Sequence, residues 1–258
     1  MPDTIIVEQS GGVMAITLNR PDVLNAVNDQ MAGELRDTLR QGTRDAAVRC
    51  VVITGAGRGF CSGQDLRDRA GGQTSYREHL HATYNPVISL IRTMEKPVLA
   101  AVNGVAAGAG CSLALAADLR VASERASFIE VFSRVGLVPD SGSTWFLPRL
   151  VGLGKALELA YLAEPVDAQE ALRLGLVNRV VPHEDLMAKT MDLAQRLAAG
   201  PTRAYGLTKR AMTYALRSTL EDALDYEAHM QEVAGRTADH REGVTAFLEK
   251  RQARYEGR

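Results

Sequence analysis

Two glycine-rich loops are the parts of this sequence that could do chemistry through their backbone. One runs from residue 55 to 66 and the other from 103 to 111, and each directly follows an apolar run. Small residues there would let backbone N–H groups approach an anion. The second loop also leads into an apolar helical pattern, and the first N–H groups of a helix favour negative charge. Neither loop has dinucleotide-binding or Walker spacing. The alternative is that the glycines only form turns.

The elements that must position these loops predict a layered α/β core. Apolar runs at 50–53 and 97–102 predict strands buried on both faces, and alternation over 13–18 predicts another strand. After the cap residue Asn28, an apolar residue recurs at every fourth position, as on one face of a helix: Met31, Leu35 and Leu39. Strand, strand and helix then recur along the chain, which favours the α/β fold class.

Beyond Gly200–Pro201 the pattern becomes helical only. Ser218 and Glu221 have the spacing of a capping box. The residues after Ser218 predict one apolar helical face, formed by Leu220, Ala223, Leu224, Met230 and Ala234. A final helix is expected near residues 243–255. Little of the remaining chain could cover these apolar residues, so we expect another subunit to bury them.

Composition and charge limit the classes of function. The 258 residues carry a formal net charge of −1, which gives no pull toward nucleic acid or an anionic membrane. The three cysteines and the histidines show no metal-binding spacing, which favours reduced thiols in a cytoplasmic protein without a metal. No export signal is visible at the N-terminus. The uncharged stretch 97–117 could span a bilayer by length, but its alanines and glycines favour a buried strand, turn and helix.

A series of ordered motifs resembles the crotonase (enoyl-CoA hydratase/isomerase) family. The stretches that carry the resemblance are FCSGQDL at 60–66, KPVLAAVNG at 96–104, ADLR at 117–120 and GLVP at 136–139. The similarity extends from residue 19 to residue 251. It implies a crotonase-type (ClpP-like) ββα spiral core at residues 1–200 with an acyl-CoA site. A C-terminal helical oligomerisation segment at 201–258 would follow. It also implies a homotrimer or a dimer of trimers, with no cofactor beyond the coenzyme A of the substrate.

The resemblance assigns roles residue by residue. The backbone N–H groups of Gln64 and Ala109 match the two oxyanion-hole donors, which hold the thioester carbonyl as charge develops on its oxygen. Other positions match or adjoin the substrate and CoA pocket: Arg20, Leu24, Ala26, Gly63, Asp65, Leu66, Gly108, Phe132, Trp145, Phe247 and Lys250. Lys250 is expected to approach from a neighbouring subunit. For Arg20 and Lys250, a solvated surface charge is the alternative.

The departures from the family pattern indicate the reaction. Family hydratases use two glutamates where this chain has Ser112 and Phe132, and neither side chain is a general acid or base near neutral pH. Asp140 stands where family isomerases and dehalogenases hold an aspartate. The stretch 136–142 resembles members that rearrange a ring epoxide in bacterial phenylacetate degradation. An apolar wall of Phe132 and Trp145 would suit Asp140 to proton transfer. A helix cap is its alternative role.

We therefore expect an isomerase in which Asp140 shifts a proton in a CoA thioester. The substrate would be a 3-enoyl-CoA or the ring epoxide of phenylacetyl-CoA. The alternatives are an enoyl-CoA hydratase, a dehalogenase, and a non-catalytic scaffold or RNA-binding relative. Glu130 is offset from the family position and is expected to be structural. His79 and His81 lie in a variable segment, residues 71–84, which in the family covers the acyl pocket; a surface role is expected for them, and a substrate contact is the alternative.

Overall fold

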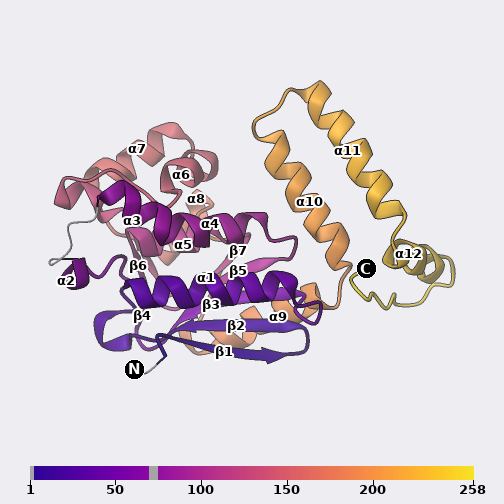
Figure 1. The fold of residues 1–258 in the computed structure, drawn as a ribbon, viewed down its shortest axis with the longest axis horizontal. Coiled ribbons are helices and arrows are strands. Elements are labelled where there is room, and N and C mark those ends of the chain that lie inside the picture. The colour runs from indigo at the N-terminus through magenta and orange to yellow at the C-terminus, as the bar shows by residue number, and fades with distance from the viewer. Residues whose placement is uncertain (1–2, 70–74) are drawn as a thin grey trace.

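The computed structural model describes residues 3–69 and 75–258, and the strands of these residues form two sheets (Figure 1). The larger sheet has the order β1-β2-β3-β5-β7-β10 and is parallel except at one edge, where β1 runs antiparallel to β2. Its strands are β1 (Ile5–Ser10), β2 (Val13–Leu18), β3 (Cys50–Gly55), β5 (Val98–Val102), β7 (Leu119–Ser123) and β10 (Arg179–Val181). The strands predicted from the apolar runs are confirmed.

The smaller sheet has the order β4-β6-β8-β9. Its strands are β4 (Gly59–Cys61), β6 (Val105–Ala107), β8 (Ser127–Ile129) and β9 (Val166–Asp167). Strands β3, β5 and β7 each continue after a turn into β4, β6 and β8, so the chain crosses repeatedly from the larger sheet to the smaller one. Helices α2 (Leu66–Arg69) and α5 (Ala109–Ala116) follow β4 and β6. Both glycine-rich loops therefore lie where the chain crosses between the sheets.

Helices cover both faces of the larger sheet, which explains why its central strands are apolar throughout. Cys50 and Val52 of β3 pack in one cluster with α9 (Leu186–Ala198). Val51 and Ile53 belong to the main core with α1 (Asp29–Arg44) and α4 (Tyr84–Thr93). Figure 1 shows α1 and α9 on opposite sides of β3. The predicted cap of α1 is confirmed, because the Asn28 side chain accepts a hydrogen bond from the amide of Met31 at 2.9 Å.

The uncharged stretch 97–117 is interior structure. It forms β5, β6 and α5, and every residue of α5 is buried. Within the described parts of the chain, no helix is long and apolar enough to cross a membrane. The three cysteines are buried and unpaired.

Further helices pack around α5 and the two sheets. The remaining short elements of the core are η1 (Pro21–Val23), α3 (Tyr76–Ala82), η2 (Val131–Val135), α6 (Ser143–Val151), α7 (Leu153–Leu162), α8 (Ala168–Leu174) and η3 (His183–Asp185). Among them, α6 contacts both α5 and α7, and α7 contacts η2.

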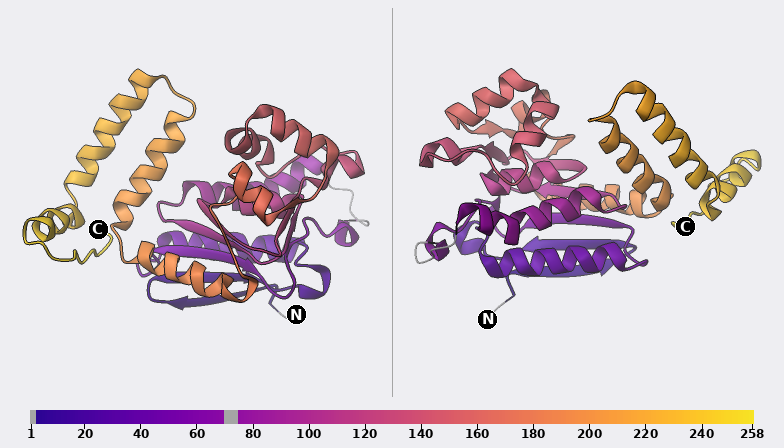
Figure 2. Two further views of the ribbon diagram at one scale, coloured as in Figure 1. Left: turned by 180° about the vertical axis from the view of Figure 1, so that it is seen from behind. Right: turned by 45° about the horizontal axis from the view of Figure 1, so that its top comes forward.

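The last helices, α10 (Thr202–Ala215), α11 (Leu220–Gly235) and α12 (Ala238–Leu248), project from the core as an arm (Figures 1 and 2). Two details of the sequence prediction were wrong. The cap of α11 is Thr219, whose side chain accepts from the amide of Asp222, and not Ser218. Helix α12 begins at Ala238, where the Thr237 hydroxyl caps it by accepting from the amide of His240, and it ends at Leu248 instead of spanning 243–255.

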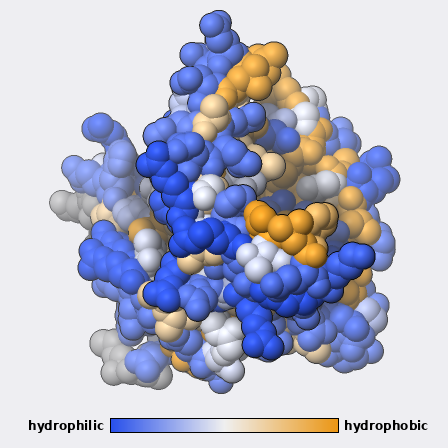
Figure 3. Space-filling view, turned by 90° about the vertical axis from the view of Figure 1, so that its right-hand side faces the viewer, coloured by the Kyte–Doolittle hydropathy of each residue, from blue (hydrophilic) through white to orange (hydrophobic). Residues whose placement is uncertain are grey.

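The arm exposes large apolar side chains. Ala223 and Met230 of α11 are buried, whereas Leu220 is 77% exposed and Phe247 of α12 is 83% exposed. Figure 3 shows apolar side chains gathered on this side of the molecule. The apolar face predicted for α11 is thus only partly covered within one chain.

Candidate active site

The first glycine-rich loop is held by side-chain amides from two neighbouring segments. The Asn25 Nδ2 group donates to the carbonyl oxygens of Ala56 and Gly59 at 2.9 and 2.8 Å. Asn103 Nδ2 donates to the carbonyls of Gly57 and Gly59 at 3.0 and 3.1 Å. The loop carbonyls therefore find donors inside the protein, as buried backbone groups require. This fixes the path of the chain into β4 and the residues that follow it.

The backbone around Gln64 leaves one amide directed away from the framework. Val27 donates to the carbonyl of Gly63 at 2.8 Å and accepts from the amide of Asp65 at 2.9 Å. Because backbone groups alternate sides along an extended segment, the Gln64 N–H points to the side opposite Val27. No acceptor among the described residues takes this N–H. It is therefore placed to donate to a ligand.

The second loop brings a helix N-terminus against the first. Gly108 precedes α5 with φ +51° and ψ −125°, a conformation that L-residues rarely adopt, and Ala109 is the first helical residue. Its N–H has no partner within the helix. A Cβ added at Gly63, whose φ is +98°, would lie 2.8 Å from the Ala107 carbonyl oxygen and 3.5 Å from the Ala109 nitrogen. The two loops thus touch at the amides assigned to the oxyanion hole.

Asp140 lies between η2 and α6, where its side chain is half-buried. Helix α6 begins at Ser143 with Gly142 at the cap position, so Asp140 is not its N-cap residue. The Ser141 hydroxyl donates to Asp140 Oδ1 at 2.8 Å, and Ser141 itself has a φ of +52°. The Asp140 carbonyl accepts from the Ser112 hydroxyl at 3.0 Å, which ties it to α5. The backbone of Asp140 is therefore held against α5, the helix that begins at Ala109 of the second loop.

A buried carboxyl group, Glu130, lies behind this arrangement. Its Oε1 atom is 3.0 Å from the Ser143 hydroxyl, which is 2.8 Å from the Ser112 hydroxyl. Burial raises the pKa of Glu130 to about 7, and the nearby charge of Asp140 adds to the rise. The Ser143 hydroxyl donates to this carboxyl group, and the Ser112 hydroxyl lies within hydrogen-bond distance of the carbonyl oxygens of Asp140 and Gly108. Sequence reasoning identified neither this chain of hydrogen bonds nor Ser143.

Phe132 and Trp145 have different surroundings. Phe132 is buried, and its Cζ atom lies 3.8 Å from the position of a Cβ added at Gly108, so the ring adjoins the second loop. The Trp145 ring lies 4.2 Å from the Arg149 guanidinium carbon and packs edge-on against Phe146. Phe132 thus lies against the second loop, and the apolar wall beside Asp140 stays a prediction. The contacts of Trp145 are with the side chains of α4 and α6.

The predicted CoA-pocket residues near the N-terminus build the first loop's support. Arg20 pairs with Asp65 at 2.8 Å and donates to the carbonyl of Ala26 at 2.6 Å, so its charge is already partly used within the chain. Leu24 packs against Gly59, since a Cβ added there would lie 3.2 Å from Leu24 Cδ2. Leu66, at the start of α2, is 61% exposed and remains available to a ligand.

Phe247 and Lys250 lie far from these residues within one chain. They belong to the end of α12 and the residue pair beyond it, at the opposite end of the molecule from α2 and β4 in Figures 1 and 2. A contact of either residue with the two loops therefore requires a second chain.

His79 is the site neighbour that sequence reasoning placed at the surface. Its side chain is only 14% exposed, and its Nε2 atom lies 2.9 Å from Nε2 of the Gln64 side chain. His81, two residues later on α3, is exposed as expected. Residues 71–74 of this variable segment lie outside the described residues. The contact between Gln64 and His79 spans fifteen residues and depends on where α3 packs, so no local sequence pattern predicts it.

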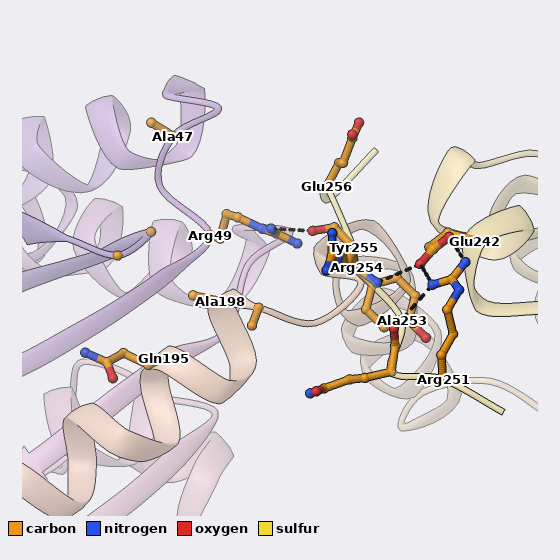
Figure 4. A pocket seen from close by; sticks show the side chains of 14 residues that line it. Ala47, Arg49, Gln195, Ala198, Glu242, Arg251, Ala253, Arg254, Tyr255 and Glu256 are labelled. Carbon is orange, nitrogen blue, oxygen red and sulfur yellow. Dashed lines mark hydrogen bonds and ion pairs between the residues drawn. The ribbon is translucent and has the colours of Figure 1, made fainter. Parts of the chain in front are cut away.

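A groove near the C-terminal tail has a different character (Figure 4). It lies among the turn at Gly11–Gly12, the end of α9 and the tail, and its wall carries the ion pair of Arg251 with Glu242. Arg49 crosses the gap and donates to the Tyr255 carbonyl at 2.9 Å. This groove opens at the amino end of β3, whereas both glycine-rich loops follow carboxyl ends of strands. It is the space between the arm and the core.

Known proteins match this chain along its whole length. The family model described as Enoyl-CoA hydratase/isomerase matches residues 8–258. The chain belongs to the enoyl-CoA hydratase/isomerase family. Membership confirms the expected crotonase-type fold and the resemblance read from the ordered motifs. Membership also makes the chain a CoA-thioester enzyme of this family.

Relatives within the family carry names of both reaction types. An Escherichia coli (strain K12) protein named 1,2-epoxyphenylacetyl-CoA isomerase is 45% identical over 262 residues, covering 100% of both chains. A Rhodobacter capsulatus protein named "probable enoyl-CoA hydratase" is 46% identical over 255 residues, covering 99% of this chain and 98% of the relative. The crystal structure of an enoyl-CoA hydratase from Bacillus anthracis is 36% identical with a TM-score of 0.93, and covers 99% and 100% of the two chains. Overall identity therefore does not separate isomerase from hydratase.

Proposed function

We propose that the protein is an acyl-CoA isomerase that shifts a proton within a CoA thioester, with Asp140 as the acid/base group. The observation that carries the proposal is the position of Asp140: its backbone carbonyl accepts from Ser112 of α5, the helix that begins at the second loop, while Ser112 and Phe132 fill the two hydratase positions. One carboxylate can move a proton from one carbon to another. Hydration needs a group to activate water and a group to protonate carbon.

The proton shift conserves every atom of the substrate. In a 3-enoyl-CoA, Asp140 takes a proton from the carbon next to the thioester carbonyl, and the electron pair delocalises onto the carbonyl oxygen. The N–H groups of Gln64 and Ala109 stabilise that charge, and losing one such donor costs about 3–4 kcal/mol in comparable sites. Asp140 then returns the proton to the fourth carbon, and the double bond moves into conjugation with the carbonyl. With the ring epoxide of phenylacetyl-CoA, the same shuttle would assist ring expansion.

The name of the Escherichia coli relative supports the ring-epoxide substrate and a role in phenylacetate catabolism. The name of the Rhodobacter capsulatus relative supports a second candidate, an enoyl-CoA hydratase in which Asp140 alone handles water. For assembly we propose a homotrimer or a dimer of trimers, because Phe247 and Lys250 can approach the two loops only from another chain. We place the enzyme in the cytoplasm, where its three buried thiols would stay reduced.

A panel of CoA thioesters tests the proposal. The purified protein is incubated separately with a 3-enoyl-CoA, with crotonyl-CoA and with the ring epoxide of phenylacetyl-CoA. The products are identified by mass spectrometry and by NMR. Isomerisation changes the NMR spectrum without changing the mass, whereas hydration adds one water. We expect isomerisation of the first or third compound and little hydration of the second. Rapid hydration of crotonyl-CoA with no isomerisation would establish the hydratase instead.

A further inference from the structure

The side chain of Gln64 has a fixed partner, although its assigned role in the oxyanion hole uses only its backbone. Its Nε2 group lies 2.9 Å from Nε2 of His79, which comes from α3 on the far side of the loop. His79 is 14% exposed, so water competes weakly for its ring nitrogen. A contact of this kind orients the residue whose amide faces the thioester oxygen.

The surroundings of His79 favour one arrangement of protons. The His79 Nδ1 atom lies 3.6 Å from a carboxylate oxygen of Asp29, at the start of α1. A proton on Nδ1 faces that negative charge and leaves Nε2 free to accept from the Gln64 amide. Tyr84 of α4 packs edge-on against the ring at 5.9 Å between ring centres. The Asp29 carboxylate near Nδ1 and the Gln64 amide at Nε2 are therefore both compatible with a proton on Nδ1.

The backbone needs such a restraint at this point. The peptide that carries the Gln64 N–H begins at Gly63, the residue with φ +98° and no Cβ to limit rotation. Among the described residues, the bond from the Val27 amide to the Gly63 carbonyl is the one backbone hydrogen bond to this peptide. The His79 contact holds Gln64 at a second point. An oxyanion hole is effective only while its donors stay within hydrogen-bond distance of the charged oxygen.

We infer that His79 is a positioning residue of the oxyanion hole, which acts through the Gln64 side chain to keep the Gln64 N–H directed at the thioester oxygen. This inference rests on the proposed function for its kinetic consequences. It does not depend on which reaction follows enolate formation. Within the described part of the chain, no hydrogen bond joins the His79 side chain to the backbone N–H of Gln64 or Ala109, so its effect should pass through the Gln64 side chain.

A double-mutant cycle with a spectroscopic readout tests this inference. His79→Phe keeps a ring against Tyr84 and removes the acceptor, and Gln64→Met keeps the backbone donor and removes the amide. His79→Gln offers a new acceptor at similar reach. His81→Phe is the matched control, because His81 is exposed on the same helix. The carbonyl stretch of a bound saturated acyl-CoA, followed by isotope-edited infrared spectroscopy, reports polarisation of the thioester without turnover.

We expect His79→Phe to lower kcat about five- to tenfold, the fold-change that corresponds to losing one net hydrogen bond. The affinity for the saturated acyl-CoA should change less than twofold. The carbonyl stretch should lose part of its shift to lower frequency. Gln64→Met should give the same losses, the double variant should add nothing to them, and His79→Gln should recover activity. His81→Phe should match the wild type.

Two results would overturn the inference. One is a His79→Phe carbonyl stretch equal to that of the wild type. The other is a kcat loss from His79→Phe that persists in the Gln64→Met background, which would place His79 on the substrate. Failure of the proposed function looks different: the wild type would polarise the carbonyl, and the variants would weaken that effect, while the product panel showed hydration instead of isomerisation.

Discussion

Replacing Glu130 by Gln should remove a specific pH dependence of stability. Glu130 is 3% exposed, and burial raises the pKa of its carboxyl from an ordinary value of 4.5 to about 7. Gln keeps the shape and stays neutral at every pH. Its amide oxygen can still accept from the Ser143 hydroxyl, as the Glu130 carboxyl oxygen does. The variant therefore isolates the free energy of ionising this one buried group.

The sign and size follow from proton linkage. Between pH 4.5 and 7 the folded protein holds a proton at Glu130 that the unfolded chain has released, so the free energy of unfolding falls as pH rises. Each pKa unit corresponds to 1.36 kcal/mol, so the total loss is about 3 kcal/mol. Below pH 4.5 both states are protonated, and above pH 7 both are ionised. The wild type should thus lose about 3 kcal/mol relative to Glu130→Gln across this window.

Urea unfolding at pH 5, 6, 7 and 8 and one protein concentration measures this difference, because all other groups titrate equally in both proteins. Glu164→Gln, at an exposed glutamate, is the matched control and should show a flat difference from the wild type. A difference between the wild type and Glu130→Gln that stays constant from pH 5 to 8 would refute the reasoning. So would one that favours the wild type as pH rises.

Three further predictions concern catalysis and assembly. Asp140→Asn should lower kcat for isomerisation 10²–10⁴-fold, the usual contribution of a positioned acid/base, with little change in CoA-ester binding by calorimetry; wild-type turnover would exclude Asp140. Crotonyl-CoA hydration should be slow in the wild type and in Ser112→Glu, because Phe132 still fills the second hydratase position, and a spectrophotometric assay showing fast hydration in either protein would contradict this. Truncation after residue 215 should give monomers or aggregates by light scattering and lower activity, whereas a compact, fully active monomer would show that the arm's apolar face serves only its own chain.

The parts of the fold that the sequence predicted are those with local signals. The central strands of the larger sheet appear as apolar runs, and the cap of α1 depends on residues three positions apart. The cap of α11 could not be chosen, because Ser218 with Glu221 and Thr219 with Asp222 offer the same spacing one residue apart. Only the packing of α11 on α10 decides between them.

The site divides in the same way. The two loops and Asp140 lie on ordered motifs, so the resemblance could propose their roles from the sequence. The pairing of Gln64 with His79 and the chain from Glu130 through Ser143 depend on helices that meet only in the folded protein. Arg20 is a residue whose partners within the chain could not be predicted from the sequence. A basic residue near a CoA pocket suggests a phosphate contact, yet much of its hydrogen bonding goes to Asp65 and Ala26.

The two-sided burial of β3 has a consequence for how the chain selects its register. A slip by one residue would exchange Cys50 and Val52 with Val51 and Ile53, and each set would still enter an apolar layer. Hydrophobic patterning therefore opposes such a slip only weakly, unlike in a strand with one polar face. The correct register of β3 must therefore be selected at its end, where the Asn25 and Asn103 side chains donate hydrogen bonds to specific carbonyls of the first loop. The loop that leads to the Gln64 amide therefore also fixes where β3 ends.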